Sequence, residues 1–269
     1  MKSGKVGLLA GRGELPVRFL RKARENKIDV VLMKIKGESD DKLSKLAYKS
    51  YDVKLTALSD IIKICKKESV TRIIMLGYVG HSNLINKIKF DLRTLKILLK
   101  IKDRRASSVL KGAINELKNE GIEVIDSRFL MSDLLAGSGY LTKKRPVKKY
   151  FDDVVFGRNI AKKISNADIG QTVVIKNKVV IAVEALEGTD ECIKRGAKLA
   201  GPGFVVVKVS RPEQDMRFDI PVIGLKTVTL LRKCKAAGIA IEAGKTFLLN
   251  RDKLISVADE NNIFVYGMK

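Results

Sequence analysis

The chain has 269 residues, of which 45% are hydrophobic, so it can bury one large core or two smaller ones. Its 53 Lys and Arg against 30 Asp and Glu give a net charge of +23. This excess favours an anionic partner such as nucleic acid, an anionic lipid surface or a phosphorylated substrate, although a lysine-rich surface without a specific partner is the open alternative. Three scattered cysteines exclude a disulfide scaffold and a cysteine zinc site, which favours a reducing cytosol. With no complete signal-peptide core and no apolar run of roughly 20 residues, we expect a soluble or peripheral protein.

Strands and helices alternate through the first half of the chain. Apolar runs predict strands at Val6–Ala10, 29–35, Arg72–Leu76 and 122–125, and helical spacing predicts helices at 59–67 and 107–120. Because this alternation is typical of a parallel sheet covered by helices, residues 1–135 are predicted to form a Rossmann-like domain. Small and basic residues then replace periodic structure, so 136–149 is predicted to be a linker.

The first strand runs into Gly11, Arg12 and Gly13, and Pro16 stands in the first turn of the helix that follows. Two glycines let the backbone approach a ligand closely, and the N–H groups at a helix start favour a phosphate. The dinucleotide-binding fingerprint needs a third glycine at position 16, where this chain has proline. A phosphate loop and an ordinary turn therefore both stay open, and a nucleotide-dependent oxidoreductase ranks last.

Between 84 and 101 the sequence predicts a basic amphipathic helix. Its apolar positions are Leu84, Ile88, Leu92, Leu95 and Leu99, and its basic positions are Lys89, Arg93, Lys96 and Lys100. Such a helix can lie on an anionic bilayer, but packing of the leucines on the sheet with solvated lysines is the favoured interpretation. The chain has a single histidine, His81, so a histidine-rich metal cluster and a Ser-His nucleophile elsewhere in the chain are excluded. His81 itself is expected to be a loop or capping residue.

The second half, 150–269, is predicted to be a mixed α/β domain. A helix at 152–164 precedes a hairpin of strands at 172–175 and 179–185. The second strand leads into a carboxylate cluster beside a helix start that Thr189 or Asp190 can cap. Further helices are predicted at 227–237 and 252–261, and further strands at 239–242, 246–249 and 264–266.

A second charged cluster interrupts the apolar residues of 205–224. It contains Gln214, Asp215, Arg217 and Asp219. Charges near a core lose hydration and must be paired, hydrogen-bonded or bound to a metal, so this stretch is predicted to be part of a site.

Four segments together resemble the LpxI-type UDP-2,3-diacylglucosamine pyrophosphatases of lipid A biosynthesis in Gram-negative bacteria. They read GLLAGRGELP at 7–16, ADIGQTVVIKNKVVIAVEALEGTDECIKR at 167–195, VKVSRPEQDMRFDIPVIGLKTV at 207–228 and GIAIEAGKTFLL at 238–249. The resemblance spans nearly the whole chain, but KDRRASSVL at 102–110 departs from the Gly-Asp-Asp pattern of many members.

The resemblance implies hydrolysis of the pyrophosphate of UDP-2,3-diacylglucosamine to UMP and 2,3-diacylglucosamine 1-phosphate, with Mg²⁺ or another divalent cation. It implies that Asp215 is the catalytic carboxylate, that Arg217 clamps phosphate, and that Glu187 is a second acid/base or ligand. Asp190 and Asp219 are the expected metal ligands. The expected substrate-binding residues are Gly11, Gly13, Leu15, Pro16, Gln171, Glu184, Thr189, Lys208 and Gln214.

The resemblance also implies a homodimer and a cytoplasmic location, peripheral at the inner membrane, where the diacylated substrate is taken up. The alternative function is a basic, non-catalytic α/β protein that binds nucleic acid. An aromatic content of only 6% and the absence of Trp disfavour base stacking. The carboxylates of the second half would also repel nucleic-acid phosphates, so a nucleic-acid partner is not expected.

Overall fold

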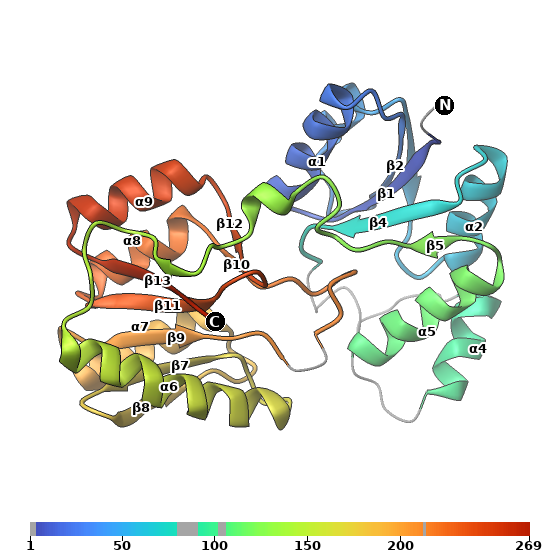
Figure 1. The fold of residues 1–269 in the computed structure, drawn as a ribbon. Helices are drawn as coiled ribbons and strands as arrows, with labels where there is room; N and C mark the ends of the chain where they lie inside the picture. Colours follow the sequence, from blue (N-terminus) through green and yellow to red (C-terminus); the bar gives the residue numbers. More distant parts are fainter. Residues whose placement is uncertain (1–3, 80–90, 102–105, 212–213) are drawn as a thin grey trace. The chain divides into compact units, whose positions relative to one another are not determined.

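The computed structural model describes residues 4–79, 91–101, 106–211 and 214–269 (Figure 1). The chain folds into two compact units. The first comprises Met1–Met131 and Met216–Phe218, and the second comprises Ser132–Asp215 and Asp219–Lys269. The predicted α/β class is confirmed, with a parallel sheet in the first unit and a mixed sheet in the second. His81 lies outside the described residues.

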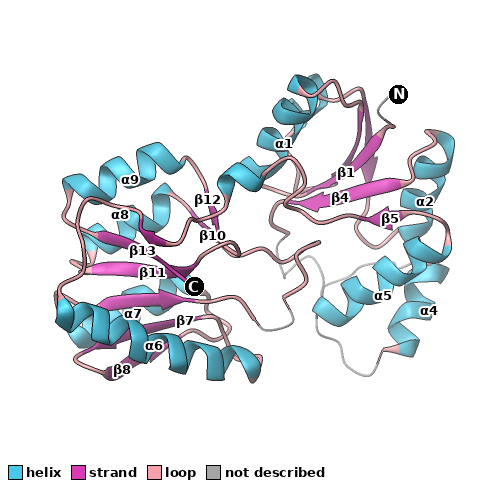
Figure 2. Ribbon diagram, viewed as in Figure 1, coloured by secondary structure: helices cyan, strands magenta, loops and turns pink. Residues whose placement is uncertain are grey.

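The first unit is built on a five-stranded parallel sheet of order β3-β2-β1-β4-β5, which confirms the Rossmann-like prediction. Its strands are β1 (Val6–Ala10), β2 (Val30–Ile35), β3 (Lys49–Val53), β4 (Arg72–Leu76) and β5 (Glu123–Val124), and its helices are α1 (Glu14–Glu25), α2 (Leu58–Lys67), α4 (Leu92–Lys100) and α5 (Ala106–Asn119), with a 3₁₀ helix η1 (Asp41–Leu46). Residues of α2, α4 and α5 share one core cluster with Leu9 and Met33. Phe19 and Leu20 of α1 are buried outside that cluster, consistent with helices on both faces of the sheet (Figure 2).

Two predictions for the first unit were incomplete or wrong. Strand β3 was missed because KSYDV is an edge strand with only Val53 buried, so it lacks the apolar run that marks its neighbours. The favoured packing of the basic helix was wrong for its described part, where Leu92, Leu95 and Leu99 are exposed. In that part of α4, Thr94 and Ile97 are the buried residues.

The second unit contains a six-stranded mixed sheet of order β6-β13-β11-β9-β7-β8 and a two-stranded parallel sheet of β10 and β12. The strands are β6 (Gly139–Tyr140), β7 (Thr172–Lys176), β8 (Val179–Val183), β9 (Val205–Lys208), β10 (Val222–Ile223), β11 (Gly238–Glu242), β12 (Phe247–Leu248) and β13 (Phe264–Met268), and the helices are α6 (Lys148–Asn166), α7 (Thr189–Ala200), α8 (Leu225–Lys233) and α9 (Arg251–Glu260), with a 3₁₀ helix η2 (Ser132–Leu134). One core cluster joins α6 to the sheet and another joins α7, α8 and α9 to it, so helices cover both faces (Figure 2).

The predicted hairpin of β7 and β8 is antiparallel and turns through Asn177 and Lys178, both at positive φ. The segment 136–149, expected to be a linker, is instead part of the second unit. Its strand β6 pairs with β13, because small residues allow Gly137 to approach Gly267 closely. Within the described part of the chain, no helix has the length and apolar character needed to cross a membrane.

The segment Met216–Phe218 belongs to the first unit although its neighbours on both sides belong to the second. The side chain of Phe218 packs on the core of the first unit. The backbone N–H of Ser127 donates to the carbonyl of Met216 at 2.9 Å, and its hydroxyl donates to the carbonyl of Arg217 at 2.8 Å. These contacts tie residues 216–218 to the end of the first unit.

Candidate functional site

Four of the predicted substrate-binding residues gather where β8 and β9 end and β7 begins. Thr172, the first residue of β7, lies in register with Lys208, the last residue of β9. The Lys208 Nζ donates to Thr189 Oγ1 at 2.6 Å, and this hydroxyl donates to Glu184 Oε1 at 2.9 Å. The backbone N–H of Gln171 donates to Glu184 Oε2 at 3.3 Å. Four of the predicted substrate-binding residues therefore form one hydrogen-bonded network.

Lys208 is the electrostatic centre of this network. Burial lowers the pKa of Lys208, because an ammonium loses hydration inside the protein, while the charges of Glu184, Asp190 and Asp219 act in the opposite direction. The two expected metal ligands, Asp190 and Asp219, thus lie within electrostatic range of the same ammonium. A buried ammonium with several carboxylates around it at a strand end marks a charged candidate site.

Helix α7 begins beside Lys208, at Thr189. Its N-cap is Gly188, at φ 82°, where a glycine is needed because other residues rarely adopt this conformation. No side chain caps the helix, so the prediction that Thr189 or Asp190 caps it is wrong. The Thr189 hydroxyl is used by Lys208 and Glu184 instead. The positive end of the α7 dipole therefore lies close to the lysine, which favours an anion.

Glu187 is paired with a residue that the sequence analysis did not name. Arg195 Nη2 donates to Glu187 Oε1 at 2.6 Å and to the carbonyl of Val183 at 2.8 Å. Hydrogen bonds from Arg195 lower the pKa of Glu187, with a further contribution from the backbone. Glu187 is therefore held as a carboxylate near neutral pH, which suits a base or ligand rather than a proton donor.

Asp219 lies in a different environment. Burial raises the pKa of Asp219, and the neighbouring carboxylates of Asp168 and Asp215 raise it further, against the charges of Arg211 and Lys208. Arg211 Nη1 lies 3.1 Å from Asp168 Oδ1 and 3.9 Å from Asp219 Oδ2. A carboxyl group with a raised pKa in a charged cluster is typical of proton transfer.

Asp168 and Arg211 were not named as site residues. Arg211 lies inside the charged stretch that the sequence analysis singled out, so its position was a usable signal. Asp168 follows α6 at φ 56° and has no sequence signal of its own beyond its place in the 167–195 segment.

Hydrogen bonds shape the loop that carries the predicted catalytic residues. The Arg211 backbone N–H donates to Gln214 Oε1 at 2.7 Å, and Gln214 Nε2 donates to the carbonyl of Asp219. The Asp219 N–H donates to the carbonyl of Asp215 at 3.0 Å. Asp215 belongs to the second unit and Arg217 to the first. The roles expected of both residues stay predictions.

Glu242, at the end of β11, holds the start of this loop. Its Oε2 accepts hydrogen bonds from the backbone N–H of Ser210 at 2.8 Å and from the Ser210 hydroxyl at 2.5 Å. It also accepts from Lys162 Nζ at 2.8 Å and from Lys245 Nζ at 3.1 Å. Burial opposes ionisation, but these hydrogen bonds outweigh it and lower the pKa of Glu242 to about 2. Glu242 thereby fixes Ser210, the residue before Arg211.

The glycine loop of the first unit lies between the ends of β1 and β4, where the strand order changes direction. This is the usual ligand position in such sheets. Arg12 and Tyr78 form a bridge across the loop, and a Cβ on Gly11 would lie 2.6 Å from the Tyr78 carbonyl oxygen. Gly11 is therefore required by packing. Gly13 is the N-cap of α1 at φ 109°, Leu15 is partly buried and Pro16 is buried.

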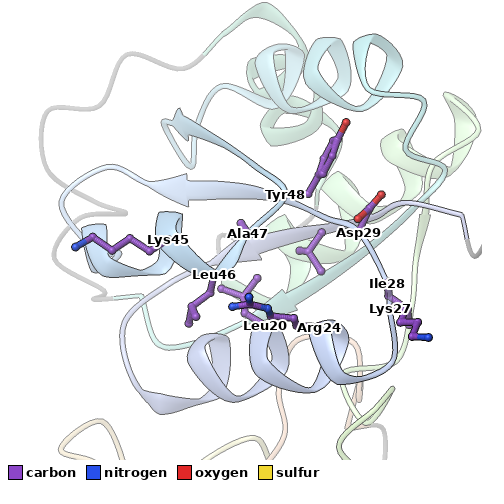
Figure 3. A pocket seen from close by; sticks show the side chains of 10 residues that line it. Leu20, Arg24, Lys27, Ile28, Asp29, Lys45, Leu46, Ala47 and Tyr48 are labelled. Carbon is purple, nitrogen blue, oxygen red and sulfur yellow. The ribbon is translucent and has the colours of Figure 1, made fainter.

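A hollow of about 420 Å³ lies at the opposite edge of this sheet, at the amino ends of β2 and β3 (Figure 3). Arg24, Lys27, Lys45, Asp29 and Tyr48 are among the residues that line it. None of the predicted site residues lines this hollow, so it is separate from the glycine loop.

A divalent metal was expected from the resemblance. Among the described residues, no group of three or more His, Cys, Asp or Glu side chains is placed to hold a metal ion. Mg²⁺ commonly uses only one or two carboxylates together with substrate phosphates, and Asp190 and Asp219 supply two carboxylates. Both carboxylates act on the Lys208 ammonium, and the metal role expected of them stays a prediction.

The fold and site define a two-unit α/β protein with a charged cluster at the strand ends of its second sheet. The chain belongs to the LpxI family: the LpxI N-terminal domain model matches residues 5–134 and the LpxI C-terminal domain model matches residues 137–266. The UDP-2,3-diacylglucosamine pyrophosphatase LpxI of Caulobacter vibrioides is 30% identical over 275 residues, which cover 98% of this chain and 97% of that protein.

Solved structures of carboxylases are more distant. The biotin carboxylase subunit of pyruvate carboxylase is 17% identical with a TM-score of 0.29, over 74% of this chain and 34% of that one. The urea carboxylase of Kluyveromyces lactis is 17% identical with a TM-score of 0.31, over 65% and 12%. This chain thus spans about a third or less of these carboxylases.

Proposed function

We propose that this protein hydrolyses the pyrophosphate bond of UDP-2,3-diacylglucosamine, releasing UMP and 2,3-diacylglucosamine 1-phosphate in lipid A biosynthesis. The observation that carries the proposal is the match of both LpxI domain models along the chain, with a relative named for this activity that aligns over 98% of it. The network around Lys208 supports the proposal, because it offers positive charge for a pyrophosphate and carboxylates for water activation.

Different residues are proposed to neutralise the pyrophosphate and to activate the attacking water. A pyrophosphate repels an incoming nucleophile, so its oxygens must be neutralised before water can attack. Lys208 and the uncapped start of α7 supply positive charge at the second unit's sheet edge. Asp215 is proposed to orient or deprotonate the water. Arg217 is proposed to clamp a phosphate through its planar fork.

A divalent cation, Mg²⁺ in the first instance, is proposed as the cofactor. Asp190 and Asp219 would hold it together with the substrate phosphates, and it would supply Lewis-acid neutralisation of the phosphoryl oxygens. Removal of divalent ions by a chelator should abolish turnover, and added Mg²⁺ should restore it. Full activity after chelation would remove the metal from the proposal.

The decisive experiment measures UMP release from UDP-2,3-diacylglucosamine by the purified protein. Asp215→Ala should lower kcat by on the order of a hundredfold or more while the variant keeps its unfolding transition. Asp60→Ala, at an exposed position in α2, is the matched control and should retain activity. Normal turnover by Asp215→Ala would eliminate this residue from the mechanism, and no turnover by the parent protein would refute the function.

We also propose that the protein is a homodimer, as the family resemblance implies. Because its substrate carries two acyl chains, we propose that it contacts the cytoplasmic face of the inner membrane. Light scattering coupled to gel filtration measures the mass of the protein in solution and should give that of a dimer. Sedimentation with membrane vesicles measures membrane binding and should carry the protein into the pellet.

A further inference from the structure

Helix α4 presents an apolar stripe to solvent. The exposed fractions are 78% for Leu92, 45% for Leu95 and 78% for Leu99. Spacings of three and four residues place these side chains along one line of the helix. Single exposed leucines are common, but an exposed row of three on one helix marks an interaction surface.

The rest of α4 explains how the helix is held without its leucines. Asp91 caps it, accepting from the backbone N–H groups of Thr94 and Ser59, both at 2.7 Å. The Thr94 hydroxyl donates to the carbonyl of Thr56 at 3.0 Å, and Ile97 is buried against Gly112. Among the described residues, these contacts hold α4 while its three leucines stay exposed.

Lys96 and Lys100 complete this surface. Each follows a leucine of the stripe by one residue, so the lysines lie along one side of it at 100° per residue. Both are exposed, and in the part of the chain that the structure describes neither makes an ion pair. Arg93 of the same helix instead pairs with Glu116, at 2.9 Å, and with Glu120.

We propose that α4 is the membrane-docking element of this protein, lying along an anionic bilayer with Leu92, Leu95 and Leu99 among the acyl chains and Lys96 and Lys100 at the lipid phosphates. Charge complementarity identifies the occupant, because leucines flanked by exposed lysines match the boundary between acyl chains and anionic headgroups. The net charge of +23 draws the chain toward the same surface. The inference rests on the proposed function, whose diacylated substrate resides in a membrane.

The first test measures sedimentation with vesicles of phosphatidylcholine alone and of equimolar phosphatidylcholine and phosphatidylglycerol. The triple variant Leu92→Gln, Leu95→Gln and Leu99→Gln should bind the anionic vesicles at least about tenfold more weakly, because its leucines no longer transfer from water. The variant Val179→Gln with Leu199→Gln, which replaces exposed apolar residues of the second unit, should bind like the parent.

The lysines are tested separately. Lys96→Glu with Lys100→Glu should lower binding to the anionic vesicles by roughly tenfold or more and remove the preference for them over phosphatidylcholine. Binding of the leucine and lysine variants equal to that of the parent would overturn the proposal.

A second test uses the absence of tryptophan from the chain. Leu95→Trp introduces a single reporter, whose emission should shift to the blue when anionic vesicles are added. Leu199→Trp, on α7, should show no shift. A shift of Leu199→Trp without one of Leu95→Trp would place the contact elsewhere and refute the assignment.

Two further measurements distinguish membrane docking from a loss of enzymatic function and from a contact between two copies of the chain. Turnover of substrate dispersed in detergent micelles should be unchanged in the leucine triple variant, so a failure of docking is distinguished from a failure of the proposed enzymatic function. Light scattering on the same variant without lipid should give the parent mass. A fall from dimer to monomer would identify the stripe as a contact between two copies of the chain, and would overturn membrane docking.

Discussion

Replacement of Glu242 by glutamine should expose how much one buried carboxylate stabilises the second unit. Glu242 is only 6% exposed and accepts hydrogen bonds from Ser210, Lys162 and Lys245. Glu242→Gln preserves the shape of the side chain but removes its charge. The Lys162 ammonium then loses its charged partner.

The magnitude follows from the pKa. Folding lowers the pKa of Glu242 from 4.5 to about 2, and each unit corresponds to about 1.4 kcal/mol, so ionisation contributes about 3 kcal/mol at neutral pH. Because the folded-state pKa is the lower one, this contribution is complete above the unfolded pKa and is lost as pH falls toward 2. At about pH 3 less than half of this contribution should remain.

The assay is urea unfolding of the parent and of Glu242→Gln at neutral pH and at about pH 3. The difference in free energy of unfolding should be close to 3 kcal/mol at neutral pH and less than half of that in acid. Glu191→Gln, which removes an exposed pair with Lys194, should cost less than about 1 kcal/mol. A difference that is small at neutral pH, or that does not change with pH, would refute this account of Glu242.

Two further substitutions test other parts of the structure. Gly11→Ala should lower the free energy of unfolding by about 1–3 kcal/mol, because its Cβ would meet the Tyr78 carbonyl, whereas Gly4→Ala, with nothing within 4 Å, should be neutral in the same urea titration. Lys208→Met should lower kcat for UMP release by on the order of a hundredfold. Because burial lowers the pKa of Lys208, parent activity that depends on its charge should decline at a lower pH than for an ordinary lysine, and an unchanged kcat would exclude this role.

The sequence predicted elements well where hydrophobic pattern decides structure. The bounds of β1 and β4 agree with the apolar runs, because strands buried on both faces leave an unbroken pattern. Strand β3 left no such pattern. For α4 the helical spacing was correct, but periodicity states only that apolar residues share a face. It does not say whether that face meets the core or the surroundings.

For the site, the sequence placed carboxylates at two strand ends, and the structure puts Glu184, Asp190 and Asp219 within electrostatic range of one lysine. The partners Arg195 and Asp168 were missed because pairing depends on how the chain folds back in three dimensions. The cap of α7 was assigned wrongly for a similar reason, since a tertiary hydrogen bond competes for the Thr189 hydroxyl.

The assignment of Met216–Phe218 to the first unit has a consequence for biosynthesis. The ribosome adds Phe218 about 85 residues after Met131. At roughly 5–20 residues per second, synthesis of this stretch takes on the order of ten seconds. During this interval the nascent first unit lacks Phe218 on its core and the carbonyl groups that Ser127 binds. Maturation of the earliest half of the polypeptide must therefore wait for translation of most of the later half.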